Sequence, residues 1–180
     1  MAPHSIMPIG FSATSGVVLV GLIFITTCII PVLSLYILKL SGSISSFSLD
    51  DKGERITPMI YTGVMYGITA YMFANKLELG EMIAVYLGIS TLLILLAGII
   101  TFFWKISLHG IGVGGFIGFL LGLNMQSSLA YFNFILPPLF IIAALVLSAR
   151  LKLNAHTPQQ VYVGFVLGIC SSFVSLMIYT

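Results

Sequence analysis

Long apolar segments alternate with short polar ones along the whole chain. Six segments are strongly apolar: residues 16–38, 58–74, 81–104, 109–123, 131–148 and 161–179. A helix that crosses a bilayer needs roughly 17 to 25 such residues. The pattern therefore predicts an all-α integral membrane protein, in which residues 1–180 form a single domain built as a bundle of six transmembrane helices.

Prolines and polar residues predict where these helices bend and begin. Pro31 lies inside the first apolar run, so we expect a kink there, which neighbouring helices can tolerate in a membrane. Pro58 opens the second run and is predicted to take the first helical position, where its missing N–H costs nothing. The serine-rich stretch between them, residues 39–57, is too polar to lie in lipid.

Composition strengthens this reading and excludes several classes of protein. Hydrophobic residues make up 59% of the chain and charged residues only 7%, against about one quarter charged in a soluble domain. The basic residues form no dense patch of the kind that binds nucleic acid. Cys28 and Cys170 lie in apolar runs, which argues against a disulfide framework. The first run is longer than a signal-peptide core and no Lys or Arg precedes it, so we expect it to be retained.

With six crossings, the loops after the first, third and fifth spans share one side, which we call face A. Six of the seven cations and two of the three histidines lie there: Lys39, Lys52, Arg55, Lys105, Arg150, Lys152, His109 and His156. This asymmetry has two explanations. Cytoplasmic loops gather Lys and Arg, or the cations and histidines surround a bound anion.

Glycines repeat every four residues in two of the predicted spans. Gly110, Gly114, Gly118 and Gly122 form one series; Gly164 and Gly168 continue to Ser172 in the other. Small residues at this spacing let membrane helices approach closely. If these two ridges meet, His109 and the stretch 150–160 begin side by side.

The residues around the two histidines suit an anion such as a phosphate. Arg150 offers a planar fork of donors, and Lys105 and Lys152 offer point charges. One histidine could act as a nucleophile and the other as the acid that protonates a leaving oxygen. No set of Cys or carboxylate ligands accompanies the histidines, so we predict no metal and no other cofactor.

The start of the last span carries a helix-capping signature. Thr157 is predicted as the N-cap residue, with Pro158 at the first helical position and Gln160 at the third, as in a capping box. The positive end of this helix would then point toward the same anion as Arg150.

Two stretches resemble the signatures of the type 2 phosphatidic acid phosphatase (PAP2) superfamily. "SARLKLNAHTPQQ" is similar to the third signature, in which Arg, five spacers, His, three spacers and Asp follow one another. Here Arg150, His156 and Gln160 keep that spacing. "ISLHG" is similar to the second signature, Pro-Ser-Gly-His, through Ser107 and His109. The number of spans also matches the family layout.

The resemblance implies a membrane phosphatase that hydrolyses a lipid phosphate or pyrophosphate through a phosphohistidine intermediate. His156 would be the nucleophile, His109 the general acid, and Arg150 a ligand of the phosphate, with Lys105 and Ser107 beside it. Gln160 stands where the family has the Asp that orients the nucleophile. The first signature is absent in its usual form, and Lys52 and Arg55 in "KGERITP" are candidate substitutes for its phosphate-binding residues.

Orientation is left with two interpretations and function with three. Many relatives have their active face outside the cytoplasm, which favours a multi-pass protein of the bacterial inner membrane with face A in the periplasm; the cation count favours the cytoplasm. An uncharged Gln160 also fits a non-catalytic relative that binds anionic lipid head groups. A small transporter is the third possibility, although no paired repeat of broken helices supports it.

Overall fold

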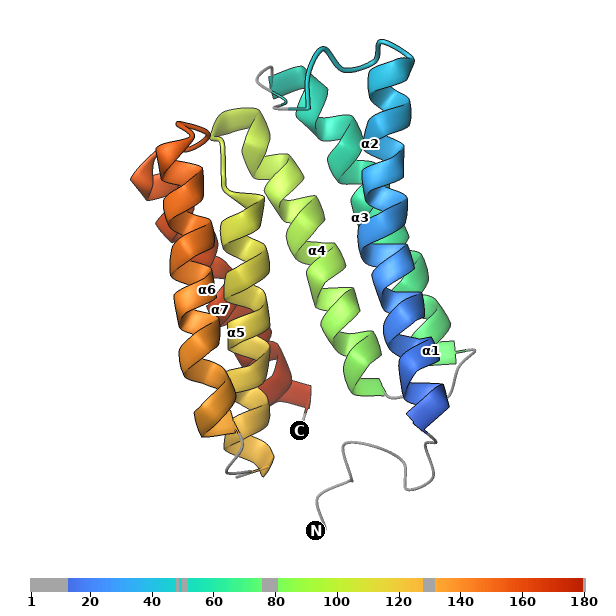
Figure 1. Ribbon diagram of the computed structural model, residues 1–180, viewed down its shortest axis with the longest axis vertical. Coiled ribbons are helices and arrows are strands. Elements are labelled where there is room, and N and C mark those ends of the chain that lie inside the picture. Colours follow the sequence, from blue (N-terminus) through green and yellow to red (C-terminus); the bar gives the residue numbers. More distant parts are fainter. Residues whose placement is uncertain (1–12, 48, 50–51, 76–80, 128–131, 180) are drawn as a thin grey trace. The chain divides into compact units, whose positions relative to one another are not determined.

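Helices account for every regular element that the structure, a computed structural model, describes in residues 13–47, 49, 52–75, 81–127 and 132–179 (Figure 1). In chain order these are α1 (Ala13–Phe24), the π-helix η1 (Ile25–Ile29), α2 (Ile30–Leu40), α3 (Lys52–Asn75), α4 (Glu81–Phe103), α5 (Leu108–Ser127), α6 (Phe132–Lys152) and α7 (Pro158–Tyr179). The predicted all-α class is confirmed.

Five helical segments are long and apolar enough to cross a membrane: Gly16–Leu40, Ile83–Phe103, Leu108–Gln126, Phe132–Lys152 and Pro158–Met177. They support a multi-pass membrane protein. Helix α3 forms where the remaining span was expected, but its Thr, Tyr and Gly residues make it less apolar than the other five.

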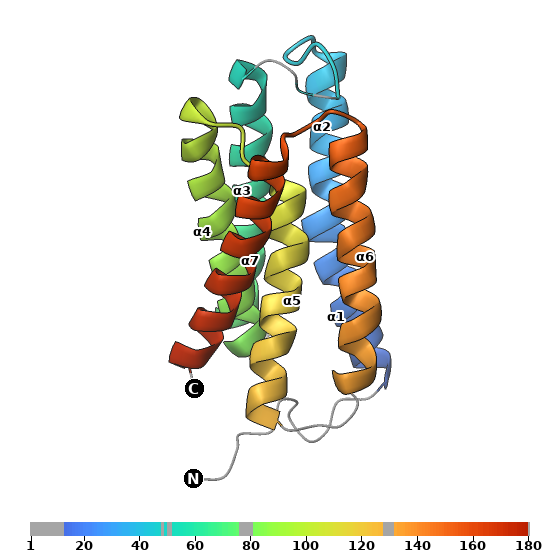
Figure 2. The same cartoon turned by 90° about the vertical axis from the view of Figure 1, so that its left-hand side faces the viewer.

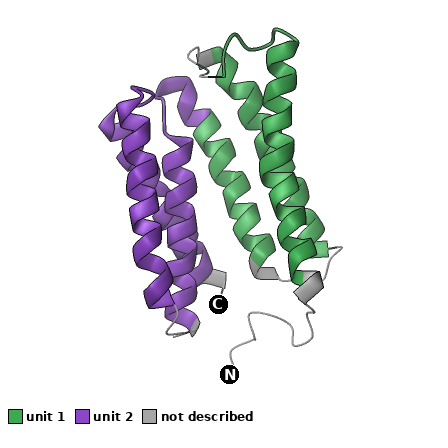
Figure 3. Cartoon of the chain, viewed as in Figure 1, with its two compact units in different colours: residues 1–98 green, residues 99–180 purple. Residues whose placement is uncertain are grey.

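The chain divides into two compact units, Met1–Gly98 and Ile99–Thr180 (Figure 3). We call them unit 1 and unit 2 and describe each by itself. Helix α4 runs from the first into the second. The core of unit 1 is a cluster around Phe73, Ala84 and Leu87, which joins α3 to α4.

The start of α3 lies six residues earlier than the sequence predicted. Pro58 is inside the helix and Lys52 begins it, so the predicted first position of Pro58 is wrong. The reason lies in Glu54, whose carboxylate accepts hydrogen bonds from the Ser45 backbone N–H at 2.8 Å and from the Ser45 hydroxyl at 2.9 Å. These bonds tie part of the polar stretch to a helical turn that precedes the proline.

The irregularity expected at Pro31 takes the form of a π-helical turn. Proline has no N–H to donate to the preceding turn, and η1 ends two residues before it. The hydroxyl groups of Thr26 and Thr27 donate to the carbonyls of Leu22 and Ile23 at 2.8 and 2.6 Å. Single π-helical turns of this kind often interrupt longer α-helices.

In unit 2, α5 and α7 lie side by side along most of their length (Figure 2). A Cβ atom added at Gly110 would come within 2.8 Å of the Val161 carbonyl oxygen, and one added at Gly164 within 2.7 Å of the Ser107 carbonyl oxygen. Only glycine lets the two backbones approach this closely. The predicted meeting of the two glycine ridges is therefore confirmed.

Candidate functional site

The candidate site is built at the end of unit 2 where α6 ends and where α5 and α7 begin. Because the glycine ridges hold α5 against α7, the backbone N–H of Ser107 donates to the carbonyl of Gln160 at 3.3 Å. The segment after α4 and the first turn of α7 are thus joined directly. The two stretches that carry the predicted signatures lie together.

The turn from α6 into α7 is fixed by backbone hydrogen bonds at the end of α6. Asn154 has a positive φ of 52°, its N–H donates to the Leu151 carbonyl at 3.0 Å, and the Ala155 N–H donates to the Arg150 carbonyl at 3.1 Å. This pair of bonds is a Schellman motif, with Asn154 in the left-handed position that ends a helix. It places Arg150 inside the last turn of α6, two residues beyond the apolar run predicted to end at Ser148.

The predicted capping box at the start of α7 is confirmed. The Thr157 backbone N–H donates to the Gln160 side-chain oxygen at 3.1 Å, and the Thr157 hydroxyl accepts the Gln160 backbone N–H at 3.5 Å. Pro158 is the first residue of the helix. The proline has no N–H and the Gln160 N–H is bonded to the cap, so neither of these two residues offers a backbone N–H to an anion.

His156 also bonds to the capping box. Its Nδ1 lies 3.3 Å from the same Gln160 oxygen that accepts the Thr157 N–H. A carbonyl oxygen can only accept, so this bond requires a proton on Nδ1. The neutral ring then carries its lone pair on Nε2. Gln160 therefore orients the imidazole while it caps the helix.

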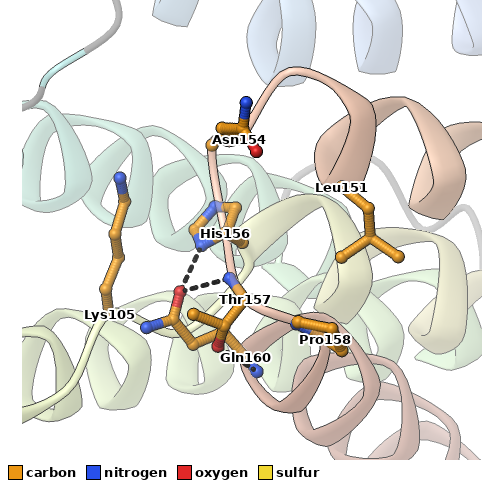
Figure 4. Close-up of a pocket in the computed structure, with 8 residues that line it drawn as sticks. Lys105, Leu151, Asn154, His156, Thr157, Pro158 and Gln160 are labelled. Atoms are coloured by element: carbon orange, nitrogen blue, oxygen red, sulfur yellow. Dashed lines mark hydrogen bonds between the residues drawn. The ribbon is translucent and has the colours of Figure 1, made fainter.

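An open pocket of about 580 Å³ surrounds this histidine (Figure 4). His156 lies near its centre, with Lys105 on one side and Leu151 and Pro158 on the other. The sequence did not single out Leu151, Asn154 and Ala155, which also line the pocket. An Asn directly after a basic helix end was the available signal for Asn154.

The electrostatic surroundings of His156 favour its neutral form. Burial lowers the pKa of the ring, and the nearby charges of Lys105 and Arg150 lower it further. Hydrogen bonds to the Gln160 side chain and to the Lys105 backbone act in the opposite direction, but the pKa stays below the ordinary value of 6.5. A neutral imidazole carries the lone pair that a nucleophile needs.

Arg150 acts electrostatically on both histidines. Its charge acts on both His156 and His109, so the guanidinium lies within electrostatic range of each ring. Its Nε is buried, with no hydrogen-bond partner among the residues that the structure describes. His109, one residue into α5, is exposed in unit 2.

Three predicted phosphate-binding residues are not among those that line this pocket. Ser107 is fully buried, with 0% of its surface exposed, and its hydroxyl accepts the Gly110 backbone N–H at 3.2 Å as the cap of α5. Lys52 and Arg55 belong to unit 1, where the Arg55 Nε donates to the Leu49 carbonyl. A role for either of these two at the His156 pocket stays a prediction.

Unit 2 contains basic residues and no acidic ones. Glu81 is the last carboxylate of the sequence, whereas Lys105, Arg150 and Lys152 all follow it. Three cations and no anion give residues 82–180 a formal charge of +3. A net positive charge attracts anions, so this part of the chain favours an anionic ligand.

The described residues contain no cluster of three or more His, Cys, Asp or Glu side chains that could hold a metal ion. Comparisons with known proteins give no further assignment: the chain matches no family of proteins, no curated protein and no solved structure.

Proposed function

We propose that the protein is a membrane phosphatase of the PAP2 type that hydrolyses a lipid phosphate or pyrophosphate. The observation that carries this proposal is the pocket in which Lys105, His156 and Gln160 lie together, with Arg150 within electrostatic range of both histidines. A neutral histidine among cationic side chains suits attack on a phosphoryl group.

The proposed reaction has two steps. Arg150 and Lys105 hold the phosphoryl oxygens while the Nε2 lone pair of His156 attacks phosphorus. The bond from phosphorus to the lipid oxygen breaks, and His109 gives that oxygen its proton. Water then attacks the phosphohistidine, His109 takes a proton from it, and the P–N bond breaks to release phosphate and His156.

In this proposal α3 is the sixth span, and face A lies in the periplasm of a bacterial inner membrane. Two polar residues of α3 are compatible with a lipid environment because their hydroxyl groups donate hydrogen bonds within the helix. Thr62 donates to the Pro58 carbonyl at 2.8 Å and Thr69 to the Met65 carbonyl at 2.7 Å. Lys52 and Arg55, in the polar stretch 39–57, stay candidate phosphate-binding residues in this proposal.

The test is phosphate release by purified protein in nanodiscs from phosphatidic acid, other lipid phosphates and isoprenyl pyrophosphates. We expect release that His156→Ala abolishes and His109→Ala strongly reduces, because each removes a step of the reaction. Acid-labile phosphate on the wild-type protein, absent from His156→Ala, would show the intermediate directly. Release at equal rates from wild type and His156→Ala would contradict the proposal.

A second function, binding of anionic lipid without turnover, is favoured by one observation. Gln160 takes the place of an orienting carboxylate and is engaged in the capping box. Unit 2 contains no Asp or Glu, so no carboxylate of this unit stabilises the protonated or phosphorylated form of His156. This alternative predicts lipid binding that Arg150→Gln weakens, with no phosphate released from any substrate.

A further inference from the structure

A second hollow in unit 2, an apolar groove of about 140 Å³, lies between α5 and α6. It faces outward from these helices, since Phe116 and Ile142 expose 44% and 52% of their surfaces. Six of the residues that line it are Gly112, Val113 and Phe116 from α5, and Leu139, Ile142 and Ala143 from α6. At Gly112 an added Cβ would meet no atom within 4 Å, so the groove has unfilled room there.

Both walls of this groove continue to an ionisable residue of the candidate site. On α5, His109 precedes Gly112 by three residues, Val113 by four and Phe116 by seven, so all four share one face of the helix. On α6, Arg150 follows Ala143 by seven residues and Leu139 by eleven, which again is one face. His109 and Arg150 therefore lie at the same end of the groove, because α5 and α6 run in opposite directions.

The usual direction of helical side chains also brings Arg150 closer to this end of the groove. Helical side chains tend to lean toward the N-terminus of their helix, which for Arg150 is the direction of the groove. Its charge reaches His109, and its buried Nε has no partner among the described residues. One end of the groove is thus cationic while its length is apolar.

The size of the groove decides what can occupy it. A helix with its side chains is about 10 Å across, too wide for a hollow of about 140 Å³, whereas a single hydrocarbon chain is narrow enough. The cationic end requires a negative group at the end of that chain. We propose that the groove between α5 and α6 binds the hydrocarbon chain of an anionic lipid whose phosphate contacts Arg150 and His109.

This inference rests on the proposed function only for the fate of the phosphate; it names the route by which the lipid reaches the histidines. The lipid would enter sideways between α5 and α6, with its ester oxygen beside His109. The groove would then select substrates by their hydrocarbon chain.

Photolabelling tests the proposal directly. The probe is phosphatidic acid with a diazirine in its acyl chain, in nanodiscs of unlabelled phosphatidylcholine; diazirine phosphatidylcholine controls for ordinary contact with lipid. We expect phosphatidic acid to label residues 112–117 and 139–143 severalfold above the outer face of α7 around Val166, and phosphatidylcholine to show no such preference. Gly112→Phe, which fills the groove, and Arg150→Gln, which removes the charge, should each abolish the preference.

Val166→Phe is the matched control, because it adds a phenyl ring at an exposed apolar position of α7 that is outside the groove. It should leave the labelling unchanged. Equal labelling of the groove and the α7 face, or a preference that survives Gly112→Phe, would overturn the proposal, as would cross-linked dimers joined through the groove. Preferential labelling without phosphate release would support lipid binding in the groove and contradict the proposed phosphatase activity. Phosphate release without preferential labelling would support the phosphatase activity and contradict binding in the groove.

Discussion

Gln160 accepts the Nδ1 proton of His156 at 3.3 Å through the same carbonyl oxygen that accepts the Thr157 N–H at 3.1 Å. The backbone donor fixes which end of the amide faces the ring, because the NH₂ group could not accept the Thr157 N–H. The orientation of the imidazole is thereby coupled to the start of α7. A change in Gln160 should act on the helix and on the histidine together.

Gln160→Glu is expected to raise the pKa of His156 while keeping the capping box. Glu is a standard partner of Thr in this motif, and its carboxylate would stabilise the protonated ring at hydrogen-bonding distance. Chemical shifts of ¹³C-labelled histidine, followed during a pH titration, measure the change. If His156→Phe removes the titrating signal and Gln160→Glu leaves it where wild type has it, the bond between the two side chains is not formed.

Gln160→Met is the companion variant, since methionine is similar in length but offers no carbonyl. It removes both hydrogen bonds, so we expect a loss of about 1 kcal/mol in stability from the weaker cap. The pKa of His156 should fall below the wild-type value, because the bond to Gln160 raises it. A pKa that rises in this variant would contradict the assignment.

The lowered pKa of His156 gives a defined dependence of stability on pH. The unfolded chain binds a proton near pH 6.5, and the folded chain does so only at lower pH because burial and neighbouring cations oppose it. As the pH falls from 6.5 to the folded pKa, the free energy of unfolding should therefore decrease, and the full stability is present above pH 6.5. His156→Asn should flatten this slope in denaturation measured between pH 7.5 and 5.

Much of unit 2 followed from sequence because its signals are local. The four-residue spacing of the glycines predicted the close contact of α5 and α7, and Thr157 with Gln160 predicted the capping box; both are confirmed. The prediction that α3 begins at Pro58 was wrong because hydrogen bonds from Ser45 to Glu54, nine residues apart, allow a turn of helix before the proline. Spacing alone could not show such a contact.

The position of the predicted site residues was less predictable. Ser107 matched a signature by residue type, but the close packing of α5 on α7 buries it. The groove between α5 and α6 carried no sequence signal, since it depends on which apolar residues leave space between two helices. The apolar character of these residues predicts that they contact either lipid or another helix, and it does not show which of the two they contact.

Gly114→Ala and Gly118→Ala should weaken the contact of α5 with α7. The added methyl groups would meet the backbone carbonyl oxygens of Phe165 and Ile169, which cannot move without shifting α7. Overpacking of this kind costs about 1 to 3 kcal/mol, visible as a lower midpoint in thermal unfolding in detergent. Gly112→Ala is the matched control on the same helix, because its methyl group meets nothing within 4 Å; equal loss in all three variants would rule out the close contact.

Ser107→Ala separates a structural role of this hydroxyl from phosphate binding. The hydroxyl accepts the Gly110 N–H inside a fully buried environment, so its removal leaves a buried donor without a partner, at a cost of about 1 to 3 kcal/mol. We expect a lower unfolding midpoint and an unchanged KM for lipid phosphate at a temperature where the variant is folded. Ser148→Ala, an exposed serine near the end of α6, should change neither quantity. A higher KM for Ser107→Ala with an unchanged midpoint would instead assign the hydroxyl to the phosphate, as the resemblance to the second signature implies.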